Sequence, residues 1–213
     1  GVSDQDGIPA RHAARGGLGA VMGLKNLKAV VIDSQGSKPP LAADPQGLKA
    51  ACRRLAKSLL AHPTTGKTLP DYGTAVIVNV VNSIAGLPTR NFSQGVFEGA
   101  EQISGEALRE LILKRGGKAS HGCMPGCVIR CSNITPDSKG NELNRALEYE
   151  TITLLGSNCG IDDLDLINQL NKRCDQLGVD TIDVGAAIGV AMEAGLAEFG
   201  DGEAALGLLD EIE

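Results

Sequence analysis

Aromatic residues are scarce in this sequence, and tryptophan is missing altogether. Aromatic side chains make up 2% of the 213 residues, whereas glycine occurs 28 times. The chain therefore has almost no platforms on which nucleic-acid bases could stack. Its core has to be built from Ala, Leu, Ile and Val, and the many glycines favour helices that pack with their backbones close together.

Excess positive charge and long apolar runs are missing as well. The formal net charge is −6, and no run of Lys or Arg exceeds three residues. Such an acidic chain argues against nucleic acid and anionic membrane surfaces as partners. The longest apolar run, TAVIVNVV at residues 74–81, is too short to cross a bilayer, and we expect no secretory signal peptide. We therefore expect neither nucleic-acid binding nor membrane insertion.

The chain also has no initiator methionine. It begins GVSDQDGIPARHAARGG and stops at LGLLDEIE. We expect an excerpt of a longer protein rather than a processed one. Its length is sufficient for one large domain or two smaller ones.

The apolar pattern predicts a mostly helical body with a short β-containing piece at the N-terminus. LKAVVID at residues 27–33 is typical of a short buried strand, and the Pro/Ser/Gly-rich stretch 34–45 is typical of a linker. Residues 87–102 and 120–141 have no period and are expected to be loops. Helices are predicted at 45–61, 69–86, 104–114, about 144–157, 162–178 and 180–195.

Three cysteines lie four residues apart in HGCMPGCVIRCSN, residues 121–133: Cys123, Cys127 and Cys131. Pro125 and Gly126 argue against a regular helix, so we expect a loop in which the three sulfurs converge on one site. Six cysteines with three in a tight cluster favour metal ligation in a reducing compartment over a disulfide framework. We therefore expect a cytoplasmic protein.

Three explanations of the cysteine cluster compete. An iron–sulfur cluster uses closely spaced cysteines and one remote cysteine, which is the pattern that we favour. Zinc prefers two separated C-x2-C pairs, which are absent, and the third explanation is thiols without any ligand. For the fourth ligand, Cys159 at a predicted turn is the best internal candidate, because Cys52 and Cys174 fall on apolar helix faces. Otherwise the fourth ligand lies beyond residue 213.

Several stretches together resemble the aldehyde:ferredoxin oxidoreductase family of tungsten- or molybdenum-dependent bis-pterin enzymes. The resemblance extends over most of the chain and keeps the family's order of motifs. The chain resembles the family's uncharacterised bacterial branch more than its archaeal tungsten enzymes. The stretches are ARGGLGAVMGLKNLKAVV (14–31), GLPTRNF (86–92), the cysteine loop, LEYETITLLGSNCGIDDL (147–164) and DQLGVDTID (175–183).

The resemblance implies a fold and an activity. Residues 1–40 would be the C-terminal tail of the pterin-binding N-terminal domain, and residues 41–213 the helical second domain with the cysteine loop. The parent chain, with its remaining domains, would interconvert small aldehydes and carboxylic acids. Electrons would pass through a [4Fe–4S] cluster to a ferredoxin-like carrier, and the fragment alone would be inactive.

The resemblance also assigns the three cysteines. Cys123, Cys127 and Cys131 match the family's cluster ligands, and the fourth ligand would come from the last domain. The spacing here is C-x3-C-x3-C, whereas the archaeal pattern is C-x2-C-x3-C.

RHAARGGLG, residues 11–19, resembles the segment that approaches the pterin phosphates and their bridging magnesium. Arg11 and Arg15 would contact the anion, and His12, which replaces the usual Ala, would act through its backbone carbonyl. Gly16 and Gly17 permit a backbone to lie close to a phosphate, although such a turn is also common as plain structure.

DQLGVD, residues 175–180, matches the family's D-x-x-G-L-D/C pattern with Val179 in place of Leu. A carboxylate can accept two parallel N–H bonds, and the edge of a pterin offers such a pair, so Asp175 and Asp180 would hold it. The alternative is that Asp180 is only a helix N-cap and Asp175 a solvated helix residue.

In the EYE sequence at residues 148–150, only one glutamate can face a buried site. Glu150 matches the family's glutamate near the metal and would accept a proton as water attacks the aldehyde carbon. The alternative is a glutamate on a helix surface. Beyond the enzyme, a second hypothesis is a non-enzymatic iron–sulfur or zinc module completed by Cys159, and a third is a scaffold without metal.

Overall fold

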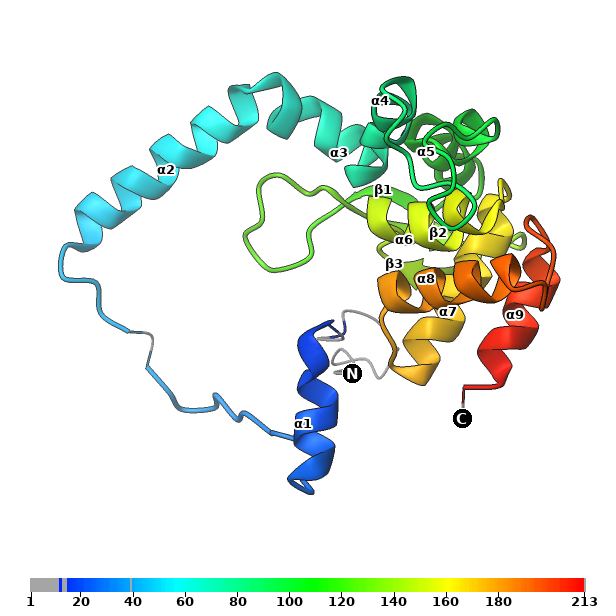
Figure 1. Ribbon diagram of the computed structural model, residues 1–213. Coiled ribbons are helices and arrows are strands. Elements are labelled where there is room, and N and C mark those ends of the chain that lie inside the picture. Colours follow the sequence, from blue (N-terminus) through cyan, green and yellow to red (C-terminus); the bar gives the residue numbers. More distant parts are fainter. Residues whose placement is uncertain (1–11, 13–14, 39, 213) are drawn as a thin grey trace.

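The computed structural model describes residues 12, 15–38 and 40–212, and it confirms the mostly helical class. Its elements are α1 (Leu18–Leu24), α2 (Pro45–Ala61), α3 (Leu69–Tyr72), α4 (Ile77–Ser83), α5 (Gly105–Lys114), β1 (Lys118–His121), β2 (Ser132–Pro136), β3 (Glu142–Arg145), α6 (Tyr149–Leu155), α7 (Leu164–Leu177), α8 (Thr181–Glu193) and α9 (Gly202–Asp210), with short turns η1 (Arg15–Gly17), η2 (Thr64–Thr68), η3 (Thr74–Val76), η4 (Ala100–Ile103) and η5 (Ser157–Cys159). Figure 1 shows α4–α9 and the sheet gathered into one body, from which α2 extends away.

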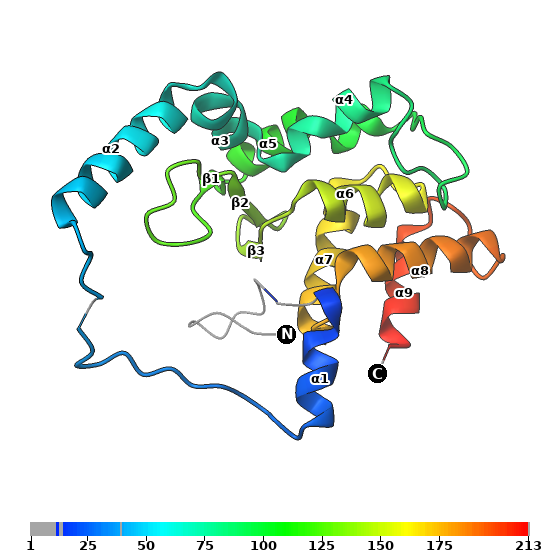
Figure 2. The ribbon, with the colours of Figure 1, turned by 60° about the vertical axis from the view of Figure 1, so that its left-hand side comes forward.

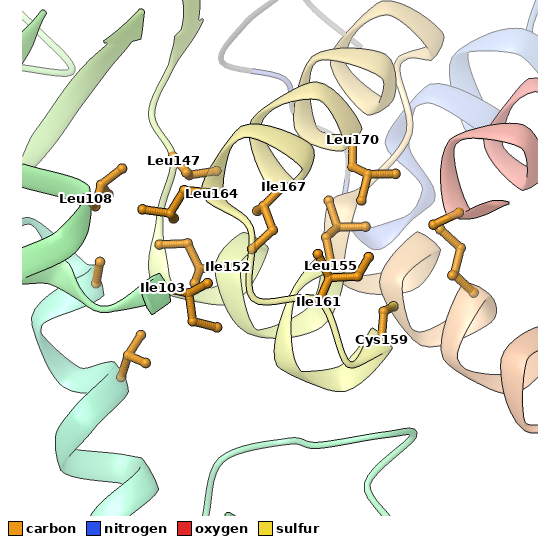
Figure 3. Packing of buried hydrophobic residues seen from close by; sticks show 14 of the residues in the cluster. Ile103, Leu108, Leu147, Ile152, Leu155, Cys159, Ile161, Leu164, Ile167 and Leu170 are labelled. Atoms are coloured by element: carbon orange, nitrogen blue, oxygen red, sulfur yellow. The ribbon is translucent and has the colours of Figure 1, made fainter. Parts of the chain in front are cut away.

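The core of this body is built from aliphatic side chains, as the shortage of aromatics requires. Helix α6 lies at its centre, where all residues from Thr151 to Leu155 are buried. Side chains of the neighbouring α7 interdigitate with it (Figure 3), and the fully buried members include Leu147, Ile152, Leu155, Ile161, Ile167 and Leu170. Burying one such side chain contributes about 1.5–3 kcal/mol, so this cluster holds α5–α9 together.

Capping residues fix the helices whose bounds the sequence predicted best. The Asp44 side chain accepts the Gly47 N–H at 2.9 Å, which starts α2 at Pro45. Ser104 caps α5 in the same way, and the Asp163 carboxylate caps α7. The α7 helix ends at Gly178, whose φ of 71° is a left-handed conformation that suits glycine.

The helix predicted over residues 69–86 is wrong as a single element, because it breaks at Gly73 into α3, η3 and α4. Gly73 has φ 63° and ψ −161°, a conformation that essentially only glycine adopts. A Cβ on this residue would lie 2.9 Å from the Cys131 carbonyl oxygen. The break therefore lets the chain turn against the base of the cysteine loop.

The prediction of a loop over residues 120–141 is correct only in part. These residues contribute to a three-stranded antiparallel sheet of order β1-β2-β3, in which His121 pairs with Ser132 and Ile134 with Arg145. Because β3 takes residues 142–145, the helix predicted from residue 144 begins only at Tyr149. The cysteines lie in the connection between β1 and β2, residues 122–131, which Figure 1 shows as a long loop projecting from the sheet.

The strand predicted at residues 27–33 does not form. None of the three strands in the described part of the chain pairs with it, and Val31 and Ile32 are 89% and 87% exposed. A strand needs a neighbour for its backbone N–H and C=O groups, so an isolated apolar run stays extended without becoming one. The described residues of the predicted linker 34–45 form neither helix nor strand before Pro45, and the domain boundary near residue 40 stays a prediction.

The apolar face of α2 is open to solvent in this structure. Leu48 and Leu55 are 55% and 61% exposed, and Cys52, on the same apolar face, is exposed as well and not part of the core. Figure 2 shows why: α2 runs away from the helical body and touches it only at its C-terminal end. Over the residues that the structure describes, no helix combines the length and the apolar character needed to cross a membrane.

Candidate functional site

The cysteine loop, residues 122–131, carries all three clustered thiols on one turn of chain. Cys123 is exposed, whereas Cys127 and Cys131 are partly buried. The loop bends through two left-handed residues, Gly126 with φ 83° and Arg130 with φ 55°. In this conformation the Arg130 N–H donates to the Cys127 sulfur at 3.4 Å.

The surroundings shift the acidity of two of these thiols in opposite directions. The Arg130 N–H, together with smaller contributions from the Ile129 N–H and Cys123, lowers the pKa of Cys127. Burial raises the pKa of Cys131, and the charge of Glu148 adds to this effect. Cys127 is therefore the thiol more easily ionised, and the thiolate is the form that binds metals.

The loop supplies suitable ligands, but they are not gathered into a closed site. Within the described residues, no three His, Cys, Asp or Glu side chains lie close enough together to hold a metal ion. The expected convergence of the three sulfurs is therefore absent from this conformation. Three thiols on one loop, with backbone N–H groups directed at a sulfur, still fit three corners of an iron–sulfur cluster by their chemistry.

Cys159, the best internal candidate for a fourth ligand, has the surroundings of a core residue in this structure. It is fully buried in the core, and its thiol donates to the Leu154 carbonyl oxygen at 3.3 Å. Burial raises its pKa to about 12. Figure 3 shows Cys159 among the aliphatic side chains at the end of α6. Cys174 is buried on α7, as its apolar position predicted, and burial also raises its pKa to about 12.

A second group of predicted residues meets in a pocket at the junction of α7 and α8. This junction pocket has a volume of about 150 Å³. Five of its lining residues were predicted from sequence, and Arg11, which was predicted with them, lies outside the described residues. The lining consists of His12, Arg15, Arg145, Ala146, Thr151, Asn171, Asp175, Val179, Asp180 and Thr181.

Asp180 has two roles at the edge of the junction pocket. One carboxylate oxygen accepts the Asp183 N–H at 3.2 Å and caps α8. The other accepts the Arg15 Nε–H at 2.9 Å, and the Asp180 side chain is only 8% exposed. Asp180 is therefore a helix N-cap, but it is not only a cap, because it also joins η1 to α8 through Arg15.

His12 and Asp175 lie opposite this pair. The His12 Nε2 is 3.5 Å from the Asp175 Oδ1, and both side chains are largely buried, at 8% and 16% exposure. Burial lowers the pKa of His12, which favours the neutral imidazole at pH 7. Asp175 is thus not the solvated helix residue that the alternative supposed.

Three features of the junction pocket escaped the sequence analysis. Asn171 is 4% exposed, and its Nδ2 has no hydrogen-bond partner among the described residues. Ala146 has φ 86°, a strained value for a residue with a side chain, and strain of this kind concentrates at functional sites. Thr151, one residue after Glu150, bonds to the Thr181 hydroxyl across the pocket at 2.9 Å. Buried amides normally find a partner, so the free donor of Asn171 fits a polar ligand.

The two predicted glycines lie beside the junction pocket with open space around them. Gly16 and Gly17 have φ 77° and 71°, and a Cβ on either would meet no atom within 4 Å. Gly17 borders a second hollow of about 580 Å³, which Val179 and Asp180 also line. The backbone of η1 is therefore accessible to a ligand.

Glu148 and Glu150 are both partly buried, but they have different surroundings. Glu150 lies partly buried in the first turn of α6, where its charge adds to the effect of burial in raising the pKa of Tyr149. Glu148 is the glutamate that contacts other elements, since it accepts hydrogen bonds from the hydroxyls of Thr74 and Ser132. The only signal for Glu148 in the sequence was its place in the EYE stretch.

Comparison with known sequences identifies relatives of this chain. A sequence model described as "Aldehyde ferredoxin oxidoreductase, domains 2 & 3" matches residues 50–213. The chain is 42% identical over 185 residues to the "Tungsten-containing aldehyde ferredoxin oxidoreductase" of Pyrococcus furiosus, and 42% identical over 184 residues to the protein of the same name in Thermococcus kodakarensis. It is 32% identical over 184 residues to the "Aliphatic sulfonate oxidoreductase, WOR-like subunit" of Pyrococcus furiosus. These matches cover 86%, 86% and 85% of the chain, but only 29%, 29% and 28% of the relatives.

Proposed function

Because this chain belongs to the aldehyde ferredoxin oxidoreductase family, we propose that it is part of an enzyme that interconverts aldehydes and carboxylic acids at a tungsten or molybdenum bis-pterin centre. The observation that carries the proposal is the junction pocket. It gathers His12, Arg15, Asp175, Val179 and Asp180, which the family resemblance assigns to cofactor binding. The chain spans less than a third of the curated relatives that it matches, so other domains of a longer protein would complete the centre.

The junction pocket would contribute half of the pterin cradle. Arg15 and the open backbone at Gly16 and Gly17 suit the pterin phosphates and a bridging Mg²⁺, since an exposed guanidinium and accessible N–H groups both bind anions. The Asp175 and Asp180 carboxylates retain lone pairs for N–H donors of the pterin edge. The free Nδ2 of Asn171 would donate to an acceptor on the same ring.

The reaction itself would use Glu150 as proton acceptor. When bound, the metal–pterin cofactor would supply the two-electron oxidation, and the [4Fe–4S] cluster would supply one-electron transfer to a ferredoxin-like carrier. A carboxylate oxygen of Glu150 would accept a proton from a water molecule while the oxygen of that water bonds to the aldehyde carbon. The match of Glu150 to the family's glutamate near the metal supports the assignment, and the next residue, Thr151, lines the junction pocket.

Cys123, Cys127 and Cys131 would be three of the cluster ligands, with the fourth from outside this chain. The burial of Cys159 supports this division, because its thiol cannot serve as a ligand while it is buried in the core. The same observation disfavours a self-contained iron–sulfur or zinc module. The six cysteines are all free, which suits a reducing compartment such as the cytoplasm.

Metal and cofactor analysis of the full-length protein, purified without oxygen, tests the proposal. We expect about four irons per chain, tungsten or molybdenum, and a fluorescent oxidised pterin after release. Reduction of a viologen dye by simple aldehydes is the matching activity assay. Iron without pterin and heavy metal would leave only an electron-transfer protein, and zinc alone would refute the proposal.

A further inference from the structure

We propose that Glu148 is a positioning residue that ties the base of the cysteine loop to the start of α6, and so fixes Cys131 relative to Glu150. The inference rests on the proposed function, because it gives the two ends of this tie a redox and a proton-transfer role. The geometry of the tie itself does not depend on any bound group.

The Glu148 carboxylate joins two elements that are distant in sequence. Its Oε2 accepts the Thr74 hydroxyl at 2.7 Å, and its Oε1 accepts the Ser132 hydroxyl at 3.2 Å. Thr74 begins η3, whereas Ser132 begins β2. Glu148 precedes α6 as its N-cap residue but makes no side-chain cap bond to the helix, so both oxygens serve the tie.

Thr74 closes the tie back onto α6. Its Oγ1 accepts the Tyr149 N–H at 2.9 Å while donating to Glu148. The hydroxyl thus holds the first residue of the helix and the carboxylate before it at the same time. Glu150 follows directly in the first turn, so its position is set by this contact.

Cys131 is held at the other end of the tie. Ser132 is its neighbour in the chain, and Gly73 brings its backbone so close that a Cβ would lie 2.9 Å from the Cys131 carbonyl oxygen. The backbone of Cys131 also pairs with that of His121, at the end of β1, in an isolated β-bridge. Cys123, by contrast, is exposed in the projecting part of the loop. Cys131 is therefore the clustered cysteine whose backbone the fold fixes most firmly.

The tie has an electrostatic consequence for the proposed cluster. The Glu148 carboxylate accepts a hydrogen bond from the hydroxyl of Ser132, the residue next to Cys131, so its negative charge lies close to this proposed ligand. A negative charge near a cluster ligand favours the oxidised, less negative state of the cluster. Removing the charge should therefore shift the midpoint potential of the cluster to a more positive value, which loss of packing alone does not predict.

The first test measures hydrogen–deuterium exchange in the full-length protein without metal. Glu148→Ala should speed amide exchange at residues 131–133 and 149–152, and leave α7 and α9 unchanged. Glu148→Gln, which keeps one acceptor oxygen, should have a smaller effect in the same segments. The matched control is Glu203→Ala, an exposed glutamate on α9. Unchanged exchange at both segments in Glu148→Ala would overturn the inference.

The second test uses the full-length holoenzyme and two near-isosteric variants. Glu148→Gln should retain most of its iron but show a more positive cluster potential in a redox titration followed by electron paramagnetic resonance. Ser132→Ala keeps the charge and should leave the potential near that of the wild type while lowering iron retention in air. The inference is refuted if Glu148→Gln has the wild-type cluster potential and Ser132→Ala retains as much iron as the wild type. An iron-free wild-type enzyme instead contradicts the proposed function.

Discussion

Asp180 carries two separable roles, and replacing it by Asn or Ala distinguishes them. One carboxylate oxygen caps α8 through the Asp183 N–H, and the other accepts Arg15 at the edge of the junction pocket. Asn is about as good an N-cap as Asp, whereas Ala is a poor one. Asp180→Asn therefore keeps the cap and changes the pocket, while Asp180→Ala removes both.

The magnitudes follow from these contacts. Loss of an N-cap costs about 1 kcal/mol, and the Arg15 pair adds less than about 1 kcal/mol because the arginine side chain is 59% exposed. We expect Asp180→Ala to lower the free energy of unfolding by about 1–2 kcal/mol. Asp180→Asn should cost about 0.5 kcal/mol, from the lost charge at the helix N-terminus and the weakened Arg15 contact.

Two assays read the two roles. Urea denaturation of this chain, followed by circular dichroism, measures the free energy of unfolding, and the midpoint for Asp180→Ala should fall by about 0.5–1 M. Pterin content of the full-length protein measures the pocket, where an amide cannot accept two parallel N–H bonds as a carboxylate does. Both variants should therefore lose pterin, although only Asp180→Ala is clearly destabilised.

Two results would refute this reasoning. If Asp180→Asn destabilises the chain as much as Asp180→Ala does, the charge and not the cap stabilises α8. If Asp180→Asn retains full pterin content, Asp180 is a helix cap without a part in cofactor binding.

Three further predictions concern thiols, the core and a histidine. In the metal-free chain, the alkylation rate of Cys127 should reach half its maximum at a lower pH than the rate of Cys131, because the pKa of Cys127 is lowered and that of Cys131 is raised. Mass spectrometry can follow the alkylation of each cysteine. The reverse order would contradict the prediction. Leu155→Ala should cost about 2–5 kcal/mol in urea denaturation, whereas Leu41→Ala, at 97% exposure, should be neutral, and equal costs would contradict the described core. In NMR spectra, His12 should titrate below its ordinary pKa of 6.5. The stability that it contributes is then fully present above pH 6.5 and is lost as the pH falls toward the pKa of the folded state. A titration midpoint of His12 at or above 6.5 would contradict its burial.

Local signals in the sequence were sufficient for most of the helices. Asp44, Ser104 and Asp163 each precede a helix that they cap, and Gly178 ends one, because capping needs only residues within one turn. The family was also readable from short motifs, since each motif is contiguous in the chain. The sheet was not, because the five residues of β2, SNITP, are all buried and show no alternation of apolar and polar residues.

The sequence by itself therefore determined the helical class and the family, because each depends on neighbours in the chain, and it predicted which residues carry the chemistry. Only the tertiary structure decided how these residues are used. It paired Arg15 with Asp180 across 165 residues, buried Cys159 away from the cysteine loop, and turned Glu148 toward Thr74. Such contacts depend on which surfaces pack together, and no spacing along the chain encodes them.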